Sequence, residues 1–396
     1  MTIPTLRRFC RLQRGVGFPP DQQGETNGEL PFFKVGDFAS IQNQRFLNHS
    51  NNWVSGDSAR QLGAVSVPPG SVLLPKIGAA LLANARRVTT VPSVFDNNVL
   101  AVIPERIESR YLYYLLSTID LAEIANPGPV PSLDDSALLD QRVLCSSAST
   151  QRAIADYLDT ETARIDALIE KKRRMVELLE ERNGASIRSA VNALSDAWVP
   201  LKRRWSVIDC KHRTPNYLDE GIPVVSPGDA TPGRLDLARA HRFVAEVDYA
   251  DLAEPPRRPA KGDIIYSRNA SIGIASYVDT DERFCMGQDV CLITSRDQDQ
   301  LYLMYLLNSV GRDLLDEAKI GSTFSRVNIE QIVEMRLPIP AVAAQRSLGQ
   351  QFDSMSRQTQ RLSEDLARQI ELLVERRQAM ITAAVTGELD IPGVAA

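Results

Sequence analysis

Residues 177–182 read ELLEER, and residues 371–376 read ELLVER, 194 positions further along the chain. The same separation relates QRAI at 151–154 to QRSL at 345–348, and Ala190-Val191 to Ala384-Val385. These matches need no gap between them. Because a fixed period of this kind identifies an internal repeat, we interpret the chain as two copies of one unit.

The sequence upstream of these matches repeats more loosely. VGD at 35–37 corresponds to PGD at 227–229, GSVL at 70–73 to GDII at 262–265, and YLYYLL at 111–116 to YLMYLL at 302–307. Each copy therefore reads as a globular domain followed by a long helix. We place the first domain at 1–149, its helix at 150–194, the second domain at 195–343, its helix at 344–388 and a tail at 389–396.

The two helical segments carry apolar residues at steps of three and four, which is the seam of a heptad pattern. No proline or glycine interrupts residues 151–182. About 40 residues at ~1.5 Å each span roughly 60 Å, which is longer than a domain of this size needs. We therefore expect the helices to pair with each other, antiparallel if a pseudo-two-fold axis relates the copies. The predicted seam consists of Leu158, Ile165, Leu168, Met175, Leu179, Phe352, Met355, Leu362, Leu366 and Leu373.

The globular domains are predicted to be mixed α/β. Short runs that favour strands, such as 71–74, 263–266 and 290–294, are separated by glycine, proline and asparagine. The Tyr-Leu blocks predict one helix in each domain, whose aromatic and leucine spacing indicates core rather than a site. The Gly-Asp pairs predict tight turns beside strands.

Composition excludes several classes of protein. With 43% hydrophobic and 24% charged residues the chain is expected to fold, and a net charge of −5 argues against binding nucleic acid through basic tails. No long apolar run or basic leader is present, so we expect a cytoplasmic protein. The sequence contains no phosphate-binding loop, dinucleotide fingerprint or metal-ligand spacing, which favours a binding protein without a catalytic site, metal or cofactor of its own.

A duplicated domain on paired helices presents two similar surfaces. Duplex DNA suits such a binder, because its recognition sites repeat along the helix axis. The two domains differ greatly outside the shared blocks. Two domains that recognise different short DNA sequences would differ in this way, since the residues that contact bases vary while the framework residues are kept.

Particular stretches resemble a known family. They are AAQR at 343–346, ELLVERRQAMITAAVTG at 371–387, CKHRTP at 210–215 and GIPVVSPGD at 221–229. With the tandem organisation, they resemble the specificity subunit of type I restriction–modification systems, the HsdS family. The first copy departs more: Asn183-Gly184 stands where the second has Arg377-Gln378, and PVP at 129–131 replaces STFSR at 322–326.

The resemblance implies two target-recognition domains, each reading half of a split DNA sequence through the major groove. It implies that antiparallel helices fix the spacer and dock two modification subunits, which bind S-adenosylmethionine and methylate adenine at N6. Restriction subunits that use ATP and Mg²⁺ would join them, and this chain would be a non-catalytic subunit of the complex.

Candidate DNA contacts follow from side-chain chemistry. Arg268 and Asn269 come after a predicted strand, and arginine pairs well with guanine and asparagine with adenine. If Arg268 reads a base, Arg268→Ala should weaken specific binding by on the order of 1–3 kcal/mol. The competing interpretation is ordinary surface charge. The candidates are Lys211, His212, Arg213, Arg268, Asn269, Ser322, Thr323 and Arg326 in the second domain, and Gln22, Gln23, Lys76, Arg86 and Arg87 in the first.

Three alternatives stay open at this point. The chain could be a scaffold whose helices dimerise and whose domains bind protein. It could be a nuclease-like enzyme with an unrecognised site, although clustered acids with a nearby lysine are missing. It could also be a specificity subunit of a methylation-only or phage-defence system.

Overall fold

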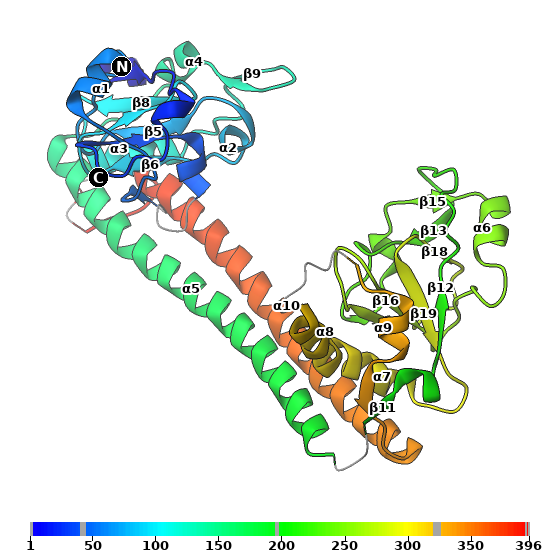
Figure 1. Ribbon diagram of the computed structural model, residues 1–396. Coiled ribbons are helices and arrows are strands. Elements are labelled where there is room, and N and C mark those ends of the chain that lie inside the picture. The colour runs from blue at the N-terminus through cyan, green and yellow to red at the C-terminus, as the bar shows by residue number, and fades with distance from the viewer. Residues whose placement is uncertain (1–2, 40–44, 195–197, 320–325, 393, 395–396) are drawn as a thin grey trace. The chain divides into compact units, whose positions relative to one another are not determined.

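The computed structural model describes residues 3–39, 45–194, 198–319, 326–392 and 394. The chain forms two compact units. One consists of residues 1–171 with 368–396, and the other of residues 172–367. Each unit therefore contains one globular domain and half of each long helix, α5 (Ala148–Asn192) and α10 (Val342–Thr386), as Figure 1 shows.

The first unit is built on a five-stranded sheet of order β1-β8-β5-β6-β3 and a three-stranded sheet of order β4-β2-β7. Its strands are β1 (Cys10–Arg14), β2 (Leu30–Phe33), β3 (Phe46–Leu47), β4 (Trp53–Val54), β5 (Val72–Pro75), β6 (Arg87–Thr89), β7 (Val94–Phe95) and β8 (Val99–Pro104), with a small pair β9 (Ala125–Asn126) and β10 (Ser132–Leu133). Its short helices are η1 (Leu6–Arg8), η2 (Pro20–Gln22), η3 (Val35–Ala39), α1 (Gly56–Gln61), α2 (Gly78–Leu82), α3 (Ser109–Ser117) and α4 (Asp135–Leu139).

The second unit has sheets of order β12-β19-β16-β17-β14 and β15-β13-β18, and a pair β11-β20. Its strands are β11 (Trp198–Pro200), β12 (Ser206–Asp209), β13 (Ile222–Val225), β14 (Gly233–Arg234), β15 (Phe243–Val244), β16 (Ile264–Ser267), β17 (Ala275–Tyr277), β18 (Cys285–Met286), β19 (Val290–Thr294) and β20 (Arg336–Pro338). Its short helices are η4 (Leu201–Arg203), η5 (Leu237–Arg239), α6 (Glu246–Leu252), α7 (Gln300–Leu306), the π-helical turn η6 (Leu307–Gly311), α8 (Arg312–Lys319) and α9 (Ile329–Val333).

The sheets of the two units correspond strand for strand. In both five-stranded sheets the first four strands pair antiparallel, and the edge strand, β3 or β14, pairs parallel. In both three-stranded sheets the central strand, β2 or β13, has one antiparallel and one parallel neighbour. The repeat predicted from the sequence is thus present in the topology, and the mixed α/β class is confirmed.

The repeated Tyr-Leu blocks form α3 and α7, and both helices begin in the same way. The side chains of Glu108 and Asp299 accept the backbone N–H groups of Tyr111 and Tyr302, which caps each helix. A buried glutamine, Gln151 on α5 or Gln345 on α10, accepts the backbone N–H of the capping residue. Residues 111–116 and 302–307 are almost wholly buried. The blocks are therefore core, as their spacing predicted, and the repeated glutamine joins each long helix to its domain.

The predicted turns are also present. Asp37 and Asp229 accept the backbone N–H of the residue three positions earlier, at 2.7 and 2.8 Å. Asp263 accepts the N–H of Ala260 in the same way. Carboxylates of this kind close turns through local hydrogen bonds.

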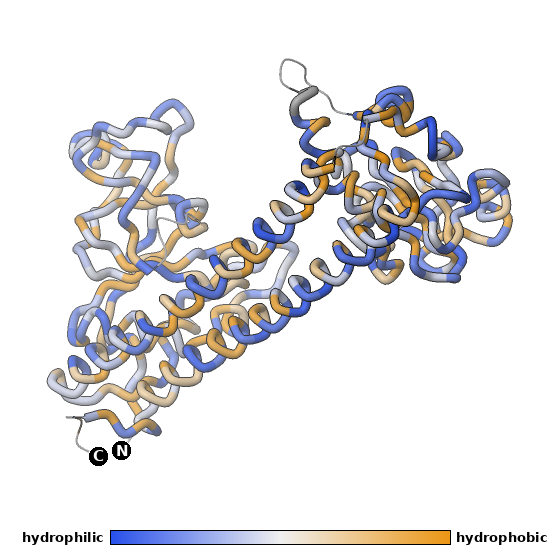
Figure 2. The backbone as a smooth tube through the Cα atoms, turned by 90° about the horizontal axis from the view of Figure 1, so that it is seen from below, coloured by the Kyte–Doolittle hydropathy of each residue, from blue (hydrophilic) through white to orange (hydrophobic). Residues whose placement is uncertain are grey.

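The long helices run antiparallel. Arg377 on α10 pairs with Asp166 on α5 at 2.9 Å in the first unit, and Asn183 on α5 donates to Ser356 on α10 at 3.0 Å in the second. Along both helices hydrophobic residues recur between hydrophilic ones (Figure 2). Among the described residues, no helix is both long and apolar enough to cross a membrane.

The seam differs from the predicted one in part. Leu158, Ile165 and Phe352 are buried, and Leu179, Met355, Leu366 and Leu373 are half-buried, but Leu168, Met175 and Leu362 are exposed. In α5 the seam continues through Thr162 and then Ile169, one residue after the predicted position. Thr162 can be buried there because its hydroxyl donates to the Leu158 carbonyl at 2.6 Å, which satisfies the hydroxyl inside the interface.

Candidate nucleic-acid interface

Loops at the ends of several strands of the second unit enclose a hollow of about 660 Å³. They follow β12, β13, β16 and β18 and precede β15. The hollow is lined by Thr214, Tyr217, Ser226, Pro227, Gly228, Asp229, His241, Arg242, Asn269, Ala270, Gln288 and Asp289. The Gly228-Asp229 turn of the repeat is thus part of its wall, whereas the sequence had predicted only a turn there.

Two non-glycine residues in this wall have left-handed backbone conformations. Ala270 has φ +53° and Asp289 has φ +63°. Such conformations cost of order 1 kcal/mol or more and often occur at binding sites, where the surrounding structure holds them. Backbone bonds hold this pair of loops, because Arg268 N–H donates to the Asp289 carbonyl at 2.9 Å and Val327 N–H donates to the Arg268 carbonyl at 2.8 Å.

The polar groups of the hollow suit hydrogen bonding to base edges. Gln288 is exposed and its amide donates to the Thr214 hydroxyl at 2.9 Å. The Asn269 amide donates to Asp289 at 3.2 Å. The Arg242 guanidinium lies 4.9 Å from the centre of the exposed Tyr217 ring. Amide, guanidinium and carboxylate groups together can match the donor and acceptor pattern of the major groove.

The predicted cations near the hollow are exposed or half-buried, and each has an acidic partner. Lys211 pairs with Asp251 at 2.5 Å, and Arg213 pairs with Asp248 and Asp251 at 2.6 and 2.5 Å. His212 contacts Asp209 at 3.1 Å, and Arg326 pairs with Asp289 at 3.0 Å. Exposed pairs of this kind are worth little and can exchange a carboxylate for a phosphate. Ser322 and Thr323 lie outside the described residues.

Arg268 lies inside the domain instead of on its surface. Its side chain is 5% exposed, its Nη1 pairs with Asp209, and its Nε donates to the Val327 carbonyl at 3.1 Å. The same holds for Arg86 in the first unit, which is 8% exposed and donates to Asn84 and to the Ile119 carbonyl. Arg268 follows the strand that suggested base reading, but the fold uses the guanidinium groups of both arginines to bridge its own loops. The structure therefore gives them a structural role in place of the predicted base contact.

The other predicted contacts of the first domain do not gather in one hollow. Gln23 accepts from Lys34 at 2.9 Å beside Gln22, and Lys76 lies 3.9 Å from Asp135. Arg87 stacks near Phe38 and donates to its carbonyl. Together with Arg86, it lines a separate hollow of about 500 Å³.

One group of side chains in the described part of the chain could hold a metal ion: Asp209, Cys210 and His212, whose ligand atoms lie within 4.8 Å of one another. Its groups are already engaged. Asp209 binds Arg268 and His212, and burial, followed by the charge of Asp209, raises the pKa of the Cys210 thiol. A protonated thiol is a poor metal ligand, so we assign no metal here.

Sequence reasoning missed Tyr217, His241, Arg242 and Gln288. They are separated along the chain and carry no motif, so only their convergence in the hollow identifies them. Arg242 immediately precedes β15 and Gln288 closely follows β18, and these positions at strand ends were the available signal.

Residues 211–372 match the family model of the type I restriction modification DNA specificity domain. This part of the chain is similar to that specificity domain. Every residue that lines the hollow lies within the matched segment, so the hollow belongs to the part of the chain that the model matches.

Solved structures share the fold over nearly the whole chain. A chain studied for the complex assembly and conformational transition of the type I R-M system aligns with a TM-score of 0.72 at 14% identity, covering 98% of this chain and 100% of that one. The HsdS subunit from Thermoanaerobacter tengcongensis aligns with a TM-score of 0.52 at 15% identity, covering 97% and 96%. The fold of the specificity domain and of its first copy is thus the fold of these chains.

Proposed function

We propose that this chain is the DNA-recognition subunit of a type I restriction–modification complex, and that the hollow of its specificity domain reads the bases of one half of a split target. The first domain reads the other half. The observation that carries the proposal is a duplicated framework, identical in strand order and pairing, whose loops at equivalent strand ends differ. After β5 the chain reads Lys76-Ile77-Gly78, and after the equivalent β16 it reads Arg268-Asn269-Ala270.

The contacts in this proposal are those that face solvent. In the specificity domain they are Gln288, Arg242, Asn269 and the exposed cations Lys211, His212, Arg213 and Arg326. In the first domain they are Gln22, Gln23, Lys76 and Arg87. Amides read base edges, while cations exchange their carboxylate partners for phosphates and position the domain.

The antiparallel helices set the spacer between the half-sites, and they offer surface to partners. Leu168, Met175, Leu178, Leu372 and Val374 leave between 47% and 58% of their surface exposed on α5 and α10. Apolar side chains exposed on a helix are candidate contacts for such partners. The partners we propose are two modification subunits, which bring S-adenosylmethionine and methylate adenine at N6, and restriction subunits, which bring ATP and Mg²⁺. The complex would act in the cytoplasm, on the host's DNA.

Mapping N6-methyladenine in the host genome with and without this gene tests the function. We expect a split motif of two short half-sites, methylated in the wild type and unmethylated in the deletion strain, and restored by the full chain on a plasmid. If the motif stays methylated in the deletion strain, the proposal is excluded. It is also excluded if the chain, assembled with its modification subunits, shows no sequence-selective DNA binding, and a protein scaffold is then favoured.

Gln288→Ala should relax the base preference in one half-site only. Removing one good base contact costs about 1–3 kcal/mol of discrimination, so the preference at that position should fall by roughly tenfold or more. The assembled complex is tested on DNA libraries randomised in one half at a time. Arg283→Ala is the control, because Arg283 is exposed and pairs with Glu246 outside the hollow. If wild type and Gln288→Ala have the same base preference in both half-sites, Gln288 does not contact a base.

A further inference from the structure

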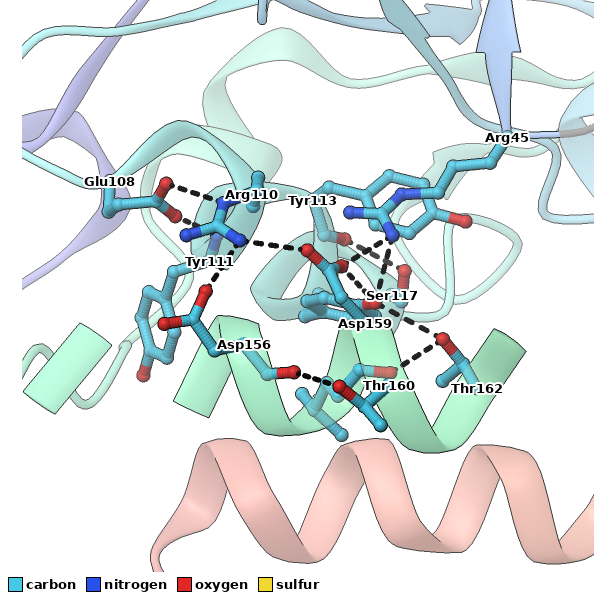
Figure 3. A network of polar contacts seen from close by, with 12 residues as sticks. Arg45, Glu108, Arg110, Tyr111, Tyr113, Ser117, Asp156, Asp159, Thr160 and Thr162 are labelled. Carbon is cyan, nitrogen blue, oxygen red and sulfur yellow. Dashed lines mark hydrogen bonds and ion pairs between the residues drawn. The ribbon is translucent and has the colours of Figure 1, made fainter. Parts of the chain in front are cut away.

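A network of polar contacts joins the globular domain of the first unit to α5. The Tyr114 hydroxyl on α3 donates to Asp159 on α5 at 2.7 Å. Arg45, next to the edge strand β3, pairs with the same carboxylate at 2.6 Å (Figure 3). Arg45 also donates to the Tyr114 oxygen at 2.9 Å, and its guanidinium lies 4.8 Å from the centre of the Tyr114 ring. Thr162, one turn further along α5, shares a hydrogen bond with Tyr114 at 3.2 Å.

The second unit contains a corresponding network built from the second copy. The Tyr305 hydroxyl on α7 donates to Asp353 on α10 at 3.0 Å, and Arg234 on the edge strand β14, which also pairs with Asp279, lies 3.2 Å from the Asp353 carboxylate. Ser356, one turn further along α10, accepts from Asn183 at 3.0 Å. Asp159 and Asp353 are 194 positions apart, as are Thr162 and Ser356.

The two arginines occupy equivalent places although no sequence match relates them. Arg45 immediately precedes β3 and Arg234 lies in β14, and these are the parallel edge strands of the two corresponding sheets. Each triad therefore joins three elements: the edge of the sheet, the helix of the Tyr-Leu block and the long helix.

This network adds direction to the apolar packing between each domain and its long helix. Apolar packing between a domain and a helix is non-directional and tolerates small rotations. Hydrogen bonds from a phenol and a guanidinium to one carboxylate require a narrow range of angles, and those to a charged group are the strongest. Because the arginine comes from the sheet edge, it resists rotation of the whole sheet about the long helix.

The Asp159 carboxylate is held in its charged form. Burial raises its pKa, but hydrogen bonds from Tyr114 and Arg45 outweigh burial, and the pKa of Asp159 lies below its usual value. The ion pair is therefore intact throughout the neutral range.

We propose that Arg45–Tyr114–Asp159 and Arg234–Tyr305–Asp353 are positioning residues, which fix each recognition domain at one angle on its long helix and thereby fix the spacer length between the two half-sites. This rests on the function proposed above. One base pair changes the separation by roughly 3.4 Å and the rotation by roughly 34°, so a domain that turns on its helix reads DNA of the wrong spacing.

The test uses the full chain assembled with its modification subunits and DNA carrying both native half-sites. The spacer is native, one base pair shorter or one longer. The variants are Tyr114→Phe, which removes only the hydroxyl, Asp159→Asn and Asp353→Asn. The control is Glu177→Gln, because Glu177 lies on the same helix, is 61% exposed and pairs with Arg174 of that helix, away from either triad.

We expect wild type and control to prefer the native spacer strongly, and the triad variants to lose about tenfold or more of that preference while keeping the base preference of each half-site. Uniformly weaker binding to all three spacers would mean a merely structural role, and an unchanged spacer preference would also overturn the inference. If Asp159→Asn does not fold, Tyr114→Phe decides. A wild-type complex without any sequence selectivity would instead refute the underlying function.

Discussion

Phe352→Ala is expected to lower the free energy of unfolding by about 3–5 kcal/mol, the range for removing a fully buried aromatic ring. Phe352 on α10 is 0% exposed, and its ring meets Tyr305 edge-on at 6.1 Å. It belongs to the core that also contains Trp205, Leu303 and Val191. The substitution would therefore leave a cavity where α10, α5 and the second domain meet.

Urea unfolding of the full chain, followed by tryptophan fluorescence, measures this effect. Trp198 and Trp205 both lie in the unit that contains Phe352, so the signal reports on the affected part. Leu362→Ala is the matched control on the same helix, because Leu362 is 43% exposed and should change stability by only about 0.5 kcal/mol. Equal losses for the two variants would show that Phe352 does not anchor the helix.

Arg268→Ala is expected to destabilise the chain by about 2–3 kcal/mol, because it removes the buried guanidinium that bridges Asp209 and the Val327 carbonyl. The estimate lies below the range for a fully buried pair, since Asp209 is 31% exposed and solvent screens part of its charge. This outcome differs from the loss of base reading that the sequence suggested.

Two measurements separate the explanations for Arg268. Urea unfolding gives the stability, and binding of the assembled complex to half-site libraries gives the base preference. Arg283→Ala is the control for removal of an exposed guanidinium, and we expect it to stay within about 0.5 kcal/mol of wild type. If Arg268→Ala keeps the wild-type stability but loses the preference at one base pair, Arg268 contacts that base after all.

The contrast between Arg268 and Gln288 explains why the site was harder to predict than the fold. Arg268 has the right chemistry and follows a strand, yet its guanidinium is used inside the domain. Gln288 belongs to no sequence motif, yet it lies exposed in the hollow. Which polar side chain faces solvent depends on which loops converge, and the sequence of one strand and its turn contains no information about the neighbouring loops.

The seam of α5 shows a smaller failure of the same kind. Leu168 and Met175 continue the apolar pattern of the predicted seam, but both are exposed, whereas Thr162 and Ile169 are buried. The Thr162 hydroxyl is satisfied there by the Leu158 carbonyl. A heptad pattern considers only apolar residues. A polar residue such as Thr162 can also be buried in the interface when its hydroxyl is hydrogen-bonded within its own helix.

The sequence by itself determined the features that can be recognised in short stretches or in their repetition. These are the duplication, the long helices, the buried Tyr-Leu blocks and the Asp37 and Asp229 turns. Tertiary structure alone decided which charges meet. Arg45 and Asp159 are 114 residues apart, and Arg234 and Asp353 are 119 apart. Contacts at such distances have no period along the chain, and they exist only because folding brings a sheet edge against a helix.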